Sequence, residues 1–397
     1  MIQRTQATAK DDIRRLNQGA VFQVVHRHGP VSRVDIAARL QLSAAAVTHI
    51  TSDLIERGLV FEARKDDERG GVGRRRILLE VAYDTAYVAG IKVSSVELTC
   101  ALTNLNAEVI HASQHPLEST APGAVIDAIE SAFHQLAERV ERPLAALGVN
   151  LPGLVDADRQ TVRHSPLLGW SQVPLGHMLE GRLGVSVLVE NDVNALALAE
   201  AWFGCGRSHD GFLVVTLGRG VGLGIVINGE VYRGPNGGAG ELGHVLLEEH
   251  GPATRYAAPG TVEAFLSDDA LQREAGRRVA RFPEDGDVAL LVELAQRGDR
   301  DALSVFADHG RALGRTLSLL VNVFAPSLIV LSGEGLRAPE LLLDAARAEL
   351  GRLAFGDLAG RTQLVVEPWG DDAWARGAAA LAASRYLTDS AMSARGD

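Results

Sequence analysis

A change of hydrophobic pattern near residue 80 constrains the fold of this chain more than any other feature. Residues 12–80 place apolar side chains at helical spacing between short turns, and two short extended segments follow. From residue 83 onward, strand-like and helix-like stretches alternate. This pattern predicts a small, mainly helical domain followed by an α/β body. A length of 397 residues accommodates two or three domains.

The first segment, residues 12–80, predicts three helices followed by a β-hairpin. The first helix ends at Gly29-Pro30, Ser32 starts the second within a capping box, and Ser43 caps the third. The apolar positions at helical spacing are Ile13, Leu16, Ala20 and Val24 in the first helix, and Val47, Ile50, Leu54 and Ile55 in the third. This order of elements is that of a winged helix-turn-helix domain, which binds DNA.

The loop between the extended segments 59–61 and 76–79 would form the wing. Its glycines permit a tight tip, and its arginines can contact phosphates or the minor groove: Arg69, Arg74, Arg75 and Arg76. On the third helix we expect DNA contacts from Ser43, Thr48, His49 and Thr51. The alternative is that this loop is only a solvated basic segment.

Charge is unevenly distributed along the chain. Residues 1–80 carry a net charge of +4 and the remaining residues a net charge of −15, within a total of −11. This asymmetry favours a nucleic-acid-binding head on an acidic body.

Composition excludes several classes of protein. The two cysteines, Cys100 and Cys205, are too few for a disulfide scaffold or a four-cysteine metal site. No apolar run approaches the roughly 18 residues that span a membrane, and the first residues lack the apolar stretch of a secretory signal. We therefore expect a soluble, cytoplasmic protein without membrane contact.

Polar clusters stand at three predicted junctions between strands and loops, where ligands bind in α/β proteins. The first is segment 190–194, between a strand and a helix, where Asp192 can accept hydrogen bonds from a hydroxyl group or act as a base. Its alternative interpretation is a helix cap. The second joins Glu241 and His244, which could instead be surface residues or metal ligands. The third, Gly218 to Gly224, has glycine at every second position, which suits a phosphate loop or a tight turn equally well.

These clusters, in this order, resemble the ROK family of repressors and sugar kinases over about residues 12–385. The resemblance rests on four segments that match family patterns: Gly148-Val149-Asn150-Leu151-Pro152-Gly153-Leu154-Val155-Asp156, Leu168-Gly169-Trp170 with Val173-Pro174-Leu175, Asn191-Asp192-Val193-Asn194-Ala195, and Thr216 to Gly243. A helix-turn-helix with a glycine- and arginine-containing wing, joined to this body, is the arrangement of the family's repressors.

The resemblance implies an actin-like (ribonuclease H-like), two-lobed sugar-kinase fold. It implies a first lobe at 83–192, completed by a C-terminal helix at about 373–386, and a second lobe at 193–372. It also implies a sugar site in the cleft made by Asn191, Asp192, Glu241, His244 and Glu263. In kinase members the residue matching Asp192 is the catalytic base, whereas repressor members keep it as a sugar ligand.

Two phosphate-binding segments depart from the kinase pattern. The "D-x-G-G-T" hairpin of kinase members is replaced by Lys92-Val93-Ser94-Ser95-Val96, which loses the aspartate that organises magnesium and the glycines that admit phosphate. The second phosphate loop has Arg219 in place of a small hydroxyl residue. Phosphoryl transfer depends on positioning by metal and backbone groups, so we expect no kinase activity and no cofactor.

The family's zinc-binding segment is also altered. Its three cysteine positions are occupied by Thr254, Tyr256 and Thr261, while the glutamate at its end is retained as Glu263. Protonated hydroxyl groups are poor zinc ligands, so we expect no bound metal. Tyr256 and Pro259 are candidates for replacing the metal by packing, and a site rebuilt from His250 with Glu248 or Glu249 is the alternative.

The sequence is best interpreted as a non-enzymatic repressor that binds operator DNA and responds to a sugar or sugar derivative. Because operators are commonly palindromic, we expect a homodimer or homotetramer. Two rivals stay open: a sugar kinase with an added DNA-binding head, and a DNA-binding protein whose body serves only for oligomerisation.

Overall fold

The computed structural model describes residues 2–65, 76–255, 257–367 and 372–393. Contacts divide the chain into two compact units: Met1–Pro152, Arg159–Glu190 and Trp374–Asp397 form the first, and Gly153–Asp158 with Asn191–Ala373 form the second. The predicted head thus groups with the predicted first lobe. Asn191 and Asp192 group with the second lobe, slightly before the expected boundary at residue 192.

The head has the predicted order of elements with one additional strand. Its elements are α1 (Ile2–His28), β1 (Val31–Ser32), α2 (Arg33–Leu40), α3 (Ala44–Glu56), β2 (Val60–Lys65) and β3 (Ile77–Val81). The predicted caps are confirmed: Ser32 accepts a hydrogen bond from Asp35 N–H, and Ser43 accepts one from Ala46 N–H. The strands form a three-stranded sheet in the order β1-β3-β2, so the extra strand β1 pairs with the hairpin.

The predicted buried face of α1 is wrong. Ile13 and Leu16 are 58% and 68% exposed, whereas Val21, Phe22 and Val25 are buried. The true face includes Gln18, whose amide donates to Asp53 in a buried hydrogen bond of 2.7 Å. Because Gln18 is polar, the inward face of α1 does not appear in the sequence as a run of apolar residues at helical spacing.

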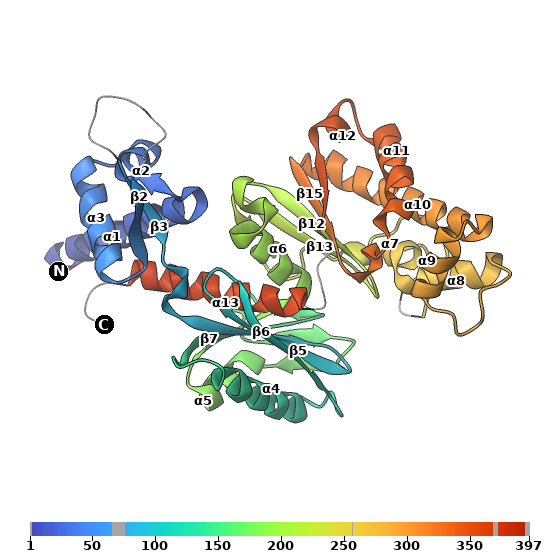
Figure 1. The fold of residues 1–397 in the computed structure, drawn as a ribbon, viewed down its shortest axis with the longest axis horizontal. Helices are drawn as coiled ribbons and strands as arrows, with labels where there is room; N and C mark the ends of the chain where they lie inside the picture. Colours follow the sequence, from blue (N-terminus) through green and yellow to red (C-terminus); the bar gives the residue numbers. More distant parts are fainter. Residues whose placement is uncertain (1, 66–75, 256, 368–371, 394–397) are drawn as a thin grey trace. The chain divides into compact units, whose positions relative to one another are not determined.

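The rest of the first unit is a mixed sheet between helices. The sheet has the order β11-β7-β4-β5-β6, with β4 antiparallel to β5 and parallel to β7. Figure 1 shows α4 and α5 on one side of this sheet and α13 on the other. The elements are η1 (Tyr83–Thr85), β4 (Tyr87–Val93), β5 (Glu97–Asn104), β6 (Val109–Pro116), α4 (Pro122–Ala137), β7 (Leu144–Leu151), β9 (Val162–Ser165), β10 (Trp170–Val173), α5 (Leu175–Leu183), β11 (Ser186–Asn191) and α13 (Ala373–Met392).

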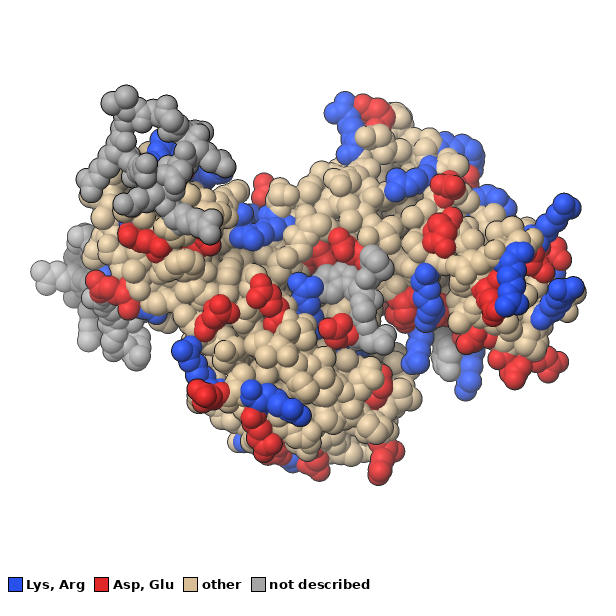
Figure 2. Space-filling model, viewed as in Figure 1, with Lys and Arg blue, Asp and Glu red and all other residues tan. Residues whose placement is uncertain are grey.

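The second unit contains another five-stranded sheet, in the order β14-β13-β12-β15-β16. Its elements are β8 (Leu154–Val155), α6 (Asp192–Phe203), η2 (Cys205–Ser208), β12 (Phe212–Leu217), β13 (Val221–Ile227), β14 (Glu230–Val231), η3 (Leu242–His244), α7 (Val262–Leu266), α8 (Asp268–Arg278), α9 (Val288–Gln296), α10 (Arg300–Phe324), β15 (Leu328–Ser332), η4 (Glu334–Leu336), η5 (Pro339–Leu341), α11 (Leu343–Leu353), α12 (Leu358–Arg361) and β16 (Gln363–Val366). Figure 2 shows acidic and basic side chains interspersed on the visible face of this unit.

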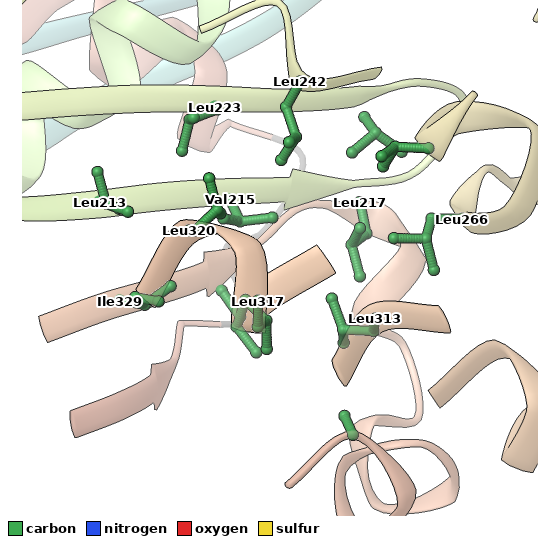
Figure 3. Packing of buried hydrophobic residues seen from close by; sticks show 14 of the residues in the cluster. Leu213, Val215, Leu217, Leu223, Leu242, Leu266, Leu313, Leu317, Leu320 and Ile329 are labelled. Carbon is green, nitrogen blue, oxygen red and sulfur yellow. The ribbon is translucent and has the colours of Figure 1, made fainter. Parts of the chain in front are cut away.

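The two faces of this second sheet pack differently. On one face, Leu213 and Val215 of β12 contribute to an aliphatic core with Leu313 and Leu317 of α10 (Figure 3). On the other face α6 approaches the strands closely. A Cβ added to Gly222 would lie 2.4 Å from Val193, and one added to Gly224 would lie 2.6 Å from Ala197. Gly222 and Gly224, two of the four alternating glycines between Gly218 and Gly224, therefore allow α6 to pack closely on the strands.

Candidate ligand site and DNA-binding surface

The strand-to-helix junction at Asn191 positions the first polar cluster. Asn191 caps α6, since its side chain accepts hydrogen bonds from Val193 N–H at 2.9 Å and Asn194 N–H at 3.1 Å. Its amide nitrogen donates to the carbonyl oxygen of Gly153 at 3.1 Å. The cap interpretation is therefore confirmed for Asn191. Asp192 follows as the first residue of α6, where its carboxylate faces the positive end of the helix dipole.

Glu241 and His244 stand together in a short turn of the second unit. His244 Nε2 lies 3.8 Å from Glu241 Oε2, and both side chains are about half exposed or more. Burial raises the pKa of Glu241; His244 opposes this shift, and the charges of Asp192 and Glu263 add to it. The structure thus brings four predicted ligand residues into one electrostatic cluster.

Glu263 enters this cluster from the first turn of α7. Its Oε2 accepts a hydrogen bond of 3.0 Å from Val221 N–H. The space around it is tight, because a Cβ on Gly220 or on Gly243 would lie 3.0 Å from the same oxygen. Burial raises the pKa of Glu263, and the hydrogen bond from Val221 opposes the shift.

The chemistry of this cluster is that of hydrogen-bond acceptors. Three carboxylates and an imidazole can accept hydrogen bonds from several hydroxyl groups at once, as a polyol ligand offers. In the described ranges, no group of three or more histidine, cysteine, aspartate or glutamate side chains is arranged to hold a metal ion.

Most of the predicted DNA-contacting residues of α3 lie at the surface. Ser43, Thr48 and His49 are exposed. The predicted DNA contact of Thr51 is wrong, because this residue is completely buried and its hydroxyl accepts a hydrogen bond of 2.9 Å from Arg33 Nε. Thr51 occupies the inward side of α3 and cannot contact a base without unfolding this packing.

The predicted wing falls mostly outside the described residues: Arg69, Arg74 and Arg75 lie there. Arg76 is described, and its guanidinium donates to Asp35 at 3.0 Å. Both side chains of this pair are exposed, which leaves Arg76 accessible. Its pairing with Asp35 joins the base of the wing to α2.

Comparisons with known proteins place this geometry in a family. The sequence pattern of the ROK family matches residues 88–385. The chain belongs to the ROK family. It is 33% identical to the DNA-binding transcriptional dual regulator NagC of Escherichia coli K12, covering 90% of this chain and 89% of NagC.

Two solved ROK structures resemble different extents of the chain. A ROK family transcriptional regulator, a homologue of the E. coli Mlc protein, matches with a TM-score of 0.81 at 26% identity, covering 96% of this chain and 98% of that one. A ROK family glucokinase from Streptomyces griseus, in complex with glucose and AMPPNP, matches with a TM-score of 0.66 at 31% identity, covering 75% of this chain and 100% of that one. The regulator therefore shares the head as well as the sugar-kinase-like body.

The first phosphate hairpin of this ROK body is closed by its own side chain. Ser94 Oγ accepts hydrogen bonds from Val96 N–H at 3.2 Å and Glu97 N–H at 3.0 Å. The Ser94 hydroxyl thus occupies backbone N–H groups of the turn that replaces the kinase hairpin. Lys92, in the place of the aspartate, stacks its ammonium group 4.8 Å from the ring centre of Trp374.

The second phosphate turn, between β12 and β13, is occupied by a carboxylate. Glu334 Oε1 accepts a hydrogen bond of 3.1 Å from Arg219 N–H. A Cβ on Gly218 would lie 2.3 Å from the Glu334 carboxyl carbon, so this glycine makes room for Glu334. A role for Glu334 was not predicted from the sequence, although a carboxylate between two glycines, Gly333 and Gly335, was a usable signal.

The altered zinc-binding segment is held by hydrogen bonds. Thr254 Oγ1 accepts from Ala257 N–H at 3.1 Å, and Thr261 Oγ1 donates to the carbonyl oxygen of Ala258 at 2.8 Å. Two of the three residues in cysteine positions thus tie the loop internally. The third, Tyr256, lies outside the described residues. None of the helices in the described part of the chain has the length and apolar character that crossing a bilayer requires.

Proposed function

We propose that this ROK protein is a sugar-responsive transcriptional repressor. Its head binds operator DNA, and its second unit binds a sugar or sugar derivative without phosphorylating it. One observation carries the proposal: the acceptor cluster around Glu241 lies in a body whose two turns at the kinase phosphate-binding positions are filled by Ser94 and Glu334. Such a body retains the means to recognise a sugar and lacks the means to position ATP.

Within the proposed sugar site, each residue has a defined role. Asp192, Glu241 and Glu263 accept hydrogen bonds from sugar hydroxyls, and His244 supplies a further donor or acceptor. Asn191 acts by capping α6, which holds Asp192 at the start of the helix. Because Asn191 already bonds to Val193, Asn194 and Gly153, we assign it a positioning role.

The proposed DNA contacts come from the recognition helix and the wing. Ser43, Thr48 and His49 belong to the exposed face of α3, and the wing arginines contribute phosphate or minor-groove contacts. A single head reads one half-site, so a palindromic operator requires at least two chains. We therefore expect a homodimer or homotetramer.

Operator binding titrated against a panel of sugars tests the proposal. The full chain is mixed with operator DNA, and each sugar is added with and without Mg-ATP. We expect one sugar to change operator affinity equally in both conditions, with no sugar phosphate formed. ATP-dependent phosphorylation that is lost in Asp192→Asn would instead identify a kinase. DNA binding that no sugar affects would favour the body that serves only for oligomerisation.

A further inference from the structure

The exposed face of the recognition helix α3 lacks the side chains that most often read bases. Its 13 residues, AAAVTHITSDLIE, include no lysine, arginine, asparagine or glutamine. The residues that the structure leaves exposed on α3 are Ala44, Ala45, Thr48, His49, Ser52 and Glu56. Arginine or lysine commonly pairs with guanine, and asparagine or glutamine with adenine. This helix therefore has neither of these pairings available.

Hydroxyl groups at the start of α3 are engaged within the helix itself. Ser43 Oγ accepts a hydrogen bond of 3.2 Å from Ala46 N–H, and Thr48 Oγ1 donates one of 2.8 Å to the carbonyl oxygen of Ala44. The hydroxyl hydrogen of Thr48 is therefore already used within the helix, and its methyl group is an apolar group on an exposed residue. With the side chains of Ala44 and Ala45, the first turns of α3 present three methyl groups.

Two of the arginines near α3 are paired with other side chains of the head, whereas Arg39 and Gln41, which precede α3, are exposed. Arg33, at the start of α2, is paired with Glu62 at 2.8 Å. Arg57, at the C-terminal end of α3, is paired with Asp53 at 3.3 Å. An approach to guanine by either residue would require breaking its ion pair. Within α3 itself, the groups left for base contacts are the methyl groups and His49.

The methyl group of thymine is the apolar feature of the major groove, and alanine and threonine methyl groups contact it. We infer that α3 reads an A·T-rich half-site through contacts of Ala44, Ala45 and Thr48 with thymine methyl groups. His49 adds the hydrogen bond to a base edge. This inference rests on the proposed function, because it specifies the DNA that the head recognises.

Selection from a random duplex library is the first experiment. The full chain is used to enrich bound duplexes, and we expect A·T pairs to predominate at the half-site positions that face α3. The wing could also favour A·T pairs through the minor groove. Enrichment alone therefore does not identify the contacting group.

Replacing thymine by deoxyuridine separates these two sources of preference. The change removes only the major-groove methyl group and leaves the minor-groove edge intact. Burying one methyl-sized group is worth about fourfold in affinity, so we expect a loss of about fourfold for each contacted dT→dU replacement. In the Ala45→Gly variant, the ratio of dT to dU affinity at the position that Ala45 contacts should fall toward 1. The ratio of dT to dU affinity is measured within one protein, so it does not depend on a change in stability.

The outcomes separate the inference from the proposed function. If no duplex is enriched, the proposed function fails. If duplexes are enriched but G·C pairs face α3, or if dT and dU duplexes bind equally at every position, DNA recognition stands and methyl recognition is overturned. Restoration of affinity by 5-methylcytosine at a disfavoured cytosine position would support the methyl contact further.

Discussion

At the scale of single residues, the carboxylates of the proposed sugar site are disfavoured by partial burial. Burial raises the pKa of both Glu241 and Glu263, so each carboxylate is destabilised as an anion in the folded chain. The penalty is present at neutral pH and disappears as the pH falls through the raised pKa. A ligand that donates hydrogen bonds to these anions would offset the penalty.

Replacing Glu263 by glutamine should therefore stabilise the protein at pH 7.5. The amide oxygen can still accept the hydrogen bond from Val221 N–H, while the buried charge is removed. We expect a higher Tm than wild type at pH 7.5, a smaller difference near pH 4.5, and loss of the sugar response. Glu230→Gln, at an exposed carboxylate of β14, is the matched control and should change neither property. A lower Tm of Glu263→Gln at pH 7.5 would show that the carboxylate is stabilising.

His309, buried within α10, should make the second unit sensitive to acid. Burial lowers the pKa of His309 to about 4, from an ordinary value of 6.5. The unfolded chain therefore binds a proton before the folded chain does, and stability is lost as pH falls from 6.5 to 4. The loss can reach roughly 3 kcal/mol. Thermal unfolding measured across this range should show a steeper decline for wild type than for His309→Gln; parallel curves would contradict the assignment.

At the scale of elements, α13 is held against the first sheet by backbone contact. A Cβ on Gly148 of β7 would lie 1.8 Å from the carbonyl oxygen of Ala378, and one on Gly90 of β4 would lie 2.1 Å from that of Ala375. Neither neighbour is a side chain that can rotate away. Helix and strands therefore touch without intervening side chains.

Gly148→Ala should separate α13 from the sheet and lower stability by about 3 kcal/mol or more. Calorimetric or thermal unfolding measures the change. Gly351→Ala is the matched control, because a Cβ at that position in α11 meets no atom within 4 Å. That control should be neutral or slightly stabilising, since alanine favours helix over glycine. Equal stability of Gly148→Ala and wild type would mean that the helix does not dock this closely.

The loop that resembles a zinc-binding segment should be stabilised by hydroxyl groups in place of metal. Thr261→Val removes the donor to the carbonyl oxygen of Ala258, and we expect a loss of about 1 kcal/mol. Chelator should leave the Tm of the wild type unchanged. Near-stoichiometric zinc in protein purified without a histidine tag, with a Tm that falls on chelation, would contradict this prediction.

At the scale of the whole molecule, the proposed sugar ligands and the DNA-contacting residues belong to different units. The head is tied to the body of its own unit through the segment between them. Tyr83 Oη lies 2.8 Å from His26 Nδ1 of α1, and the Tyr83 carbonyl oxygen accepts a hydrogen bond of 3.0 Å from Leu105 N–H. A displacement of this unit would therefore carry the head with it.

Asp192→Asn should consequently uncouple the two functions. We expect sugar affinity to fall about ten- to hundredfold, because a charged acceptor is replaced by a neutral one, while operator affinity without sugar stays at the wild-type value. Asp285→Asn, at an exposed position of the second unit, is the control and should retain the full response. An Asp192→Asn variant that responds normally to sugar would place the ligand elsewhere.

The sequence by itself determined the features of this protein that depend on neighbouring residues. The caps at Ser32 and Ser43 are local, because each requires only a few adjacent dihedral angles and one or two hydrogen bonds. The order of motifs also indicated the ROK family, which the comparisons confirmed.

Only the tertiary structure decided which side chains are accessible and which are already engaged. Thr51 is hidden by Arg33, and the phosphate turn is filled by Glu334, 115 residues beyond Arg219. Spacing along a chain does not encode such contacts, because they arise when distant elements pack together. The same holds for Gly222 and Gly224, whose roles became visible only once α6 lay against their strand.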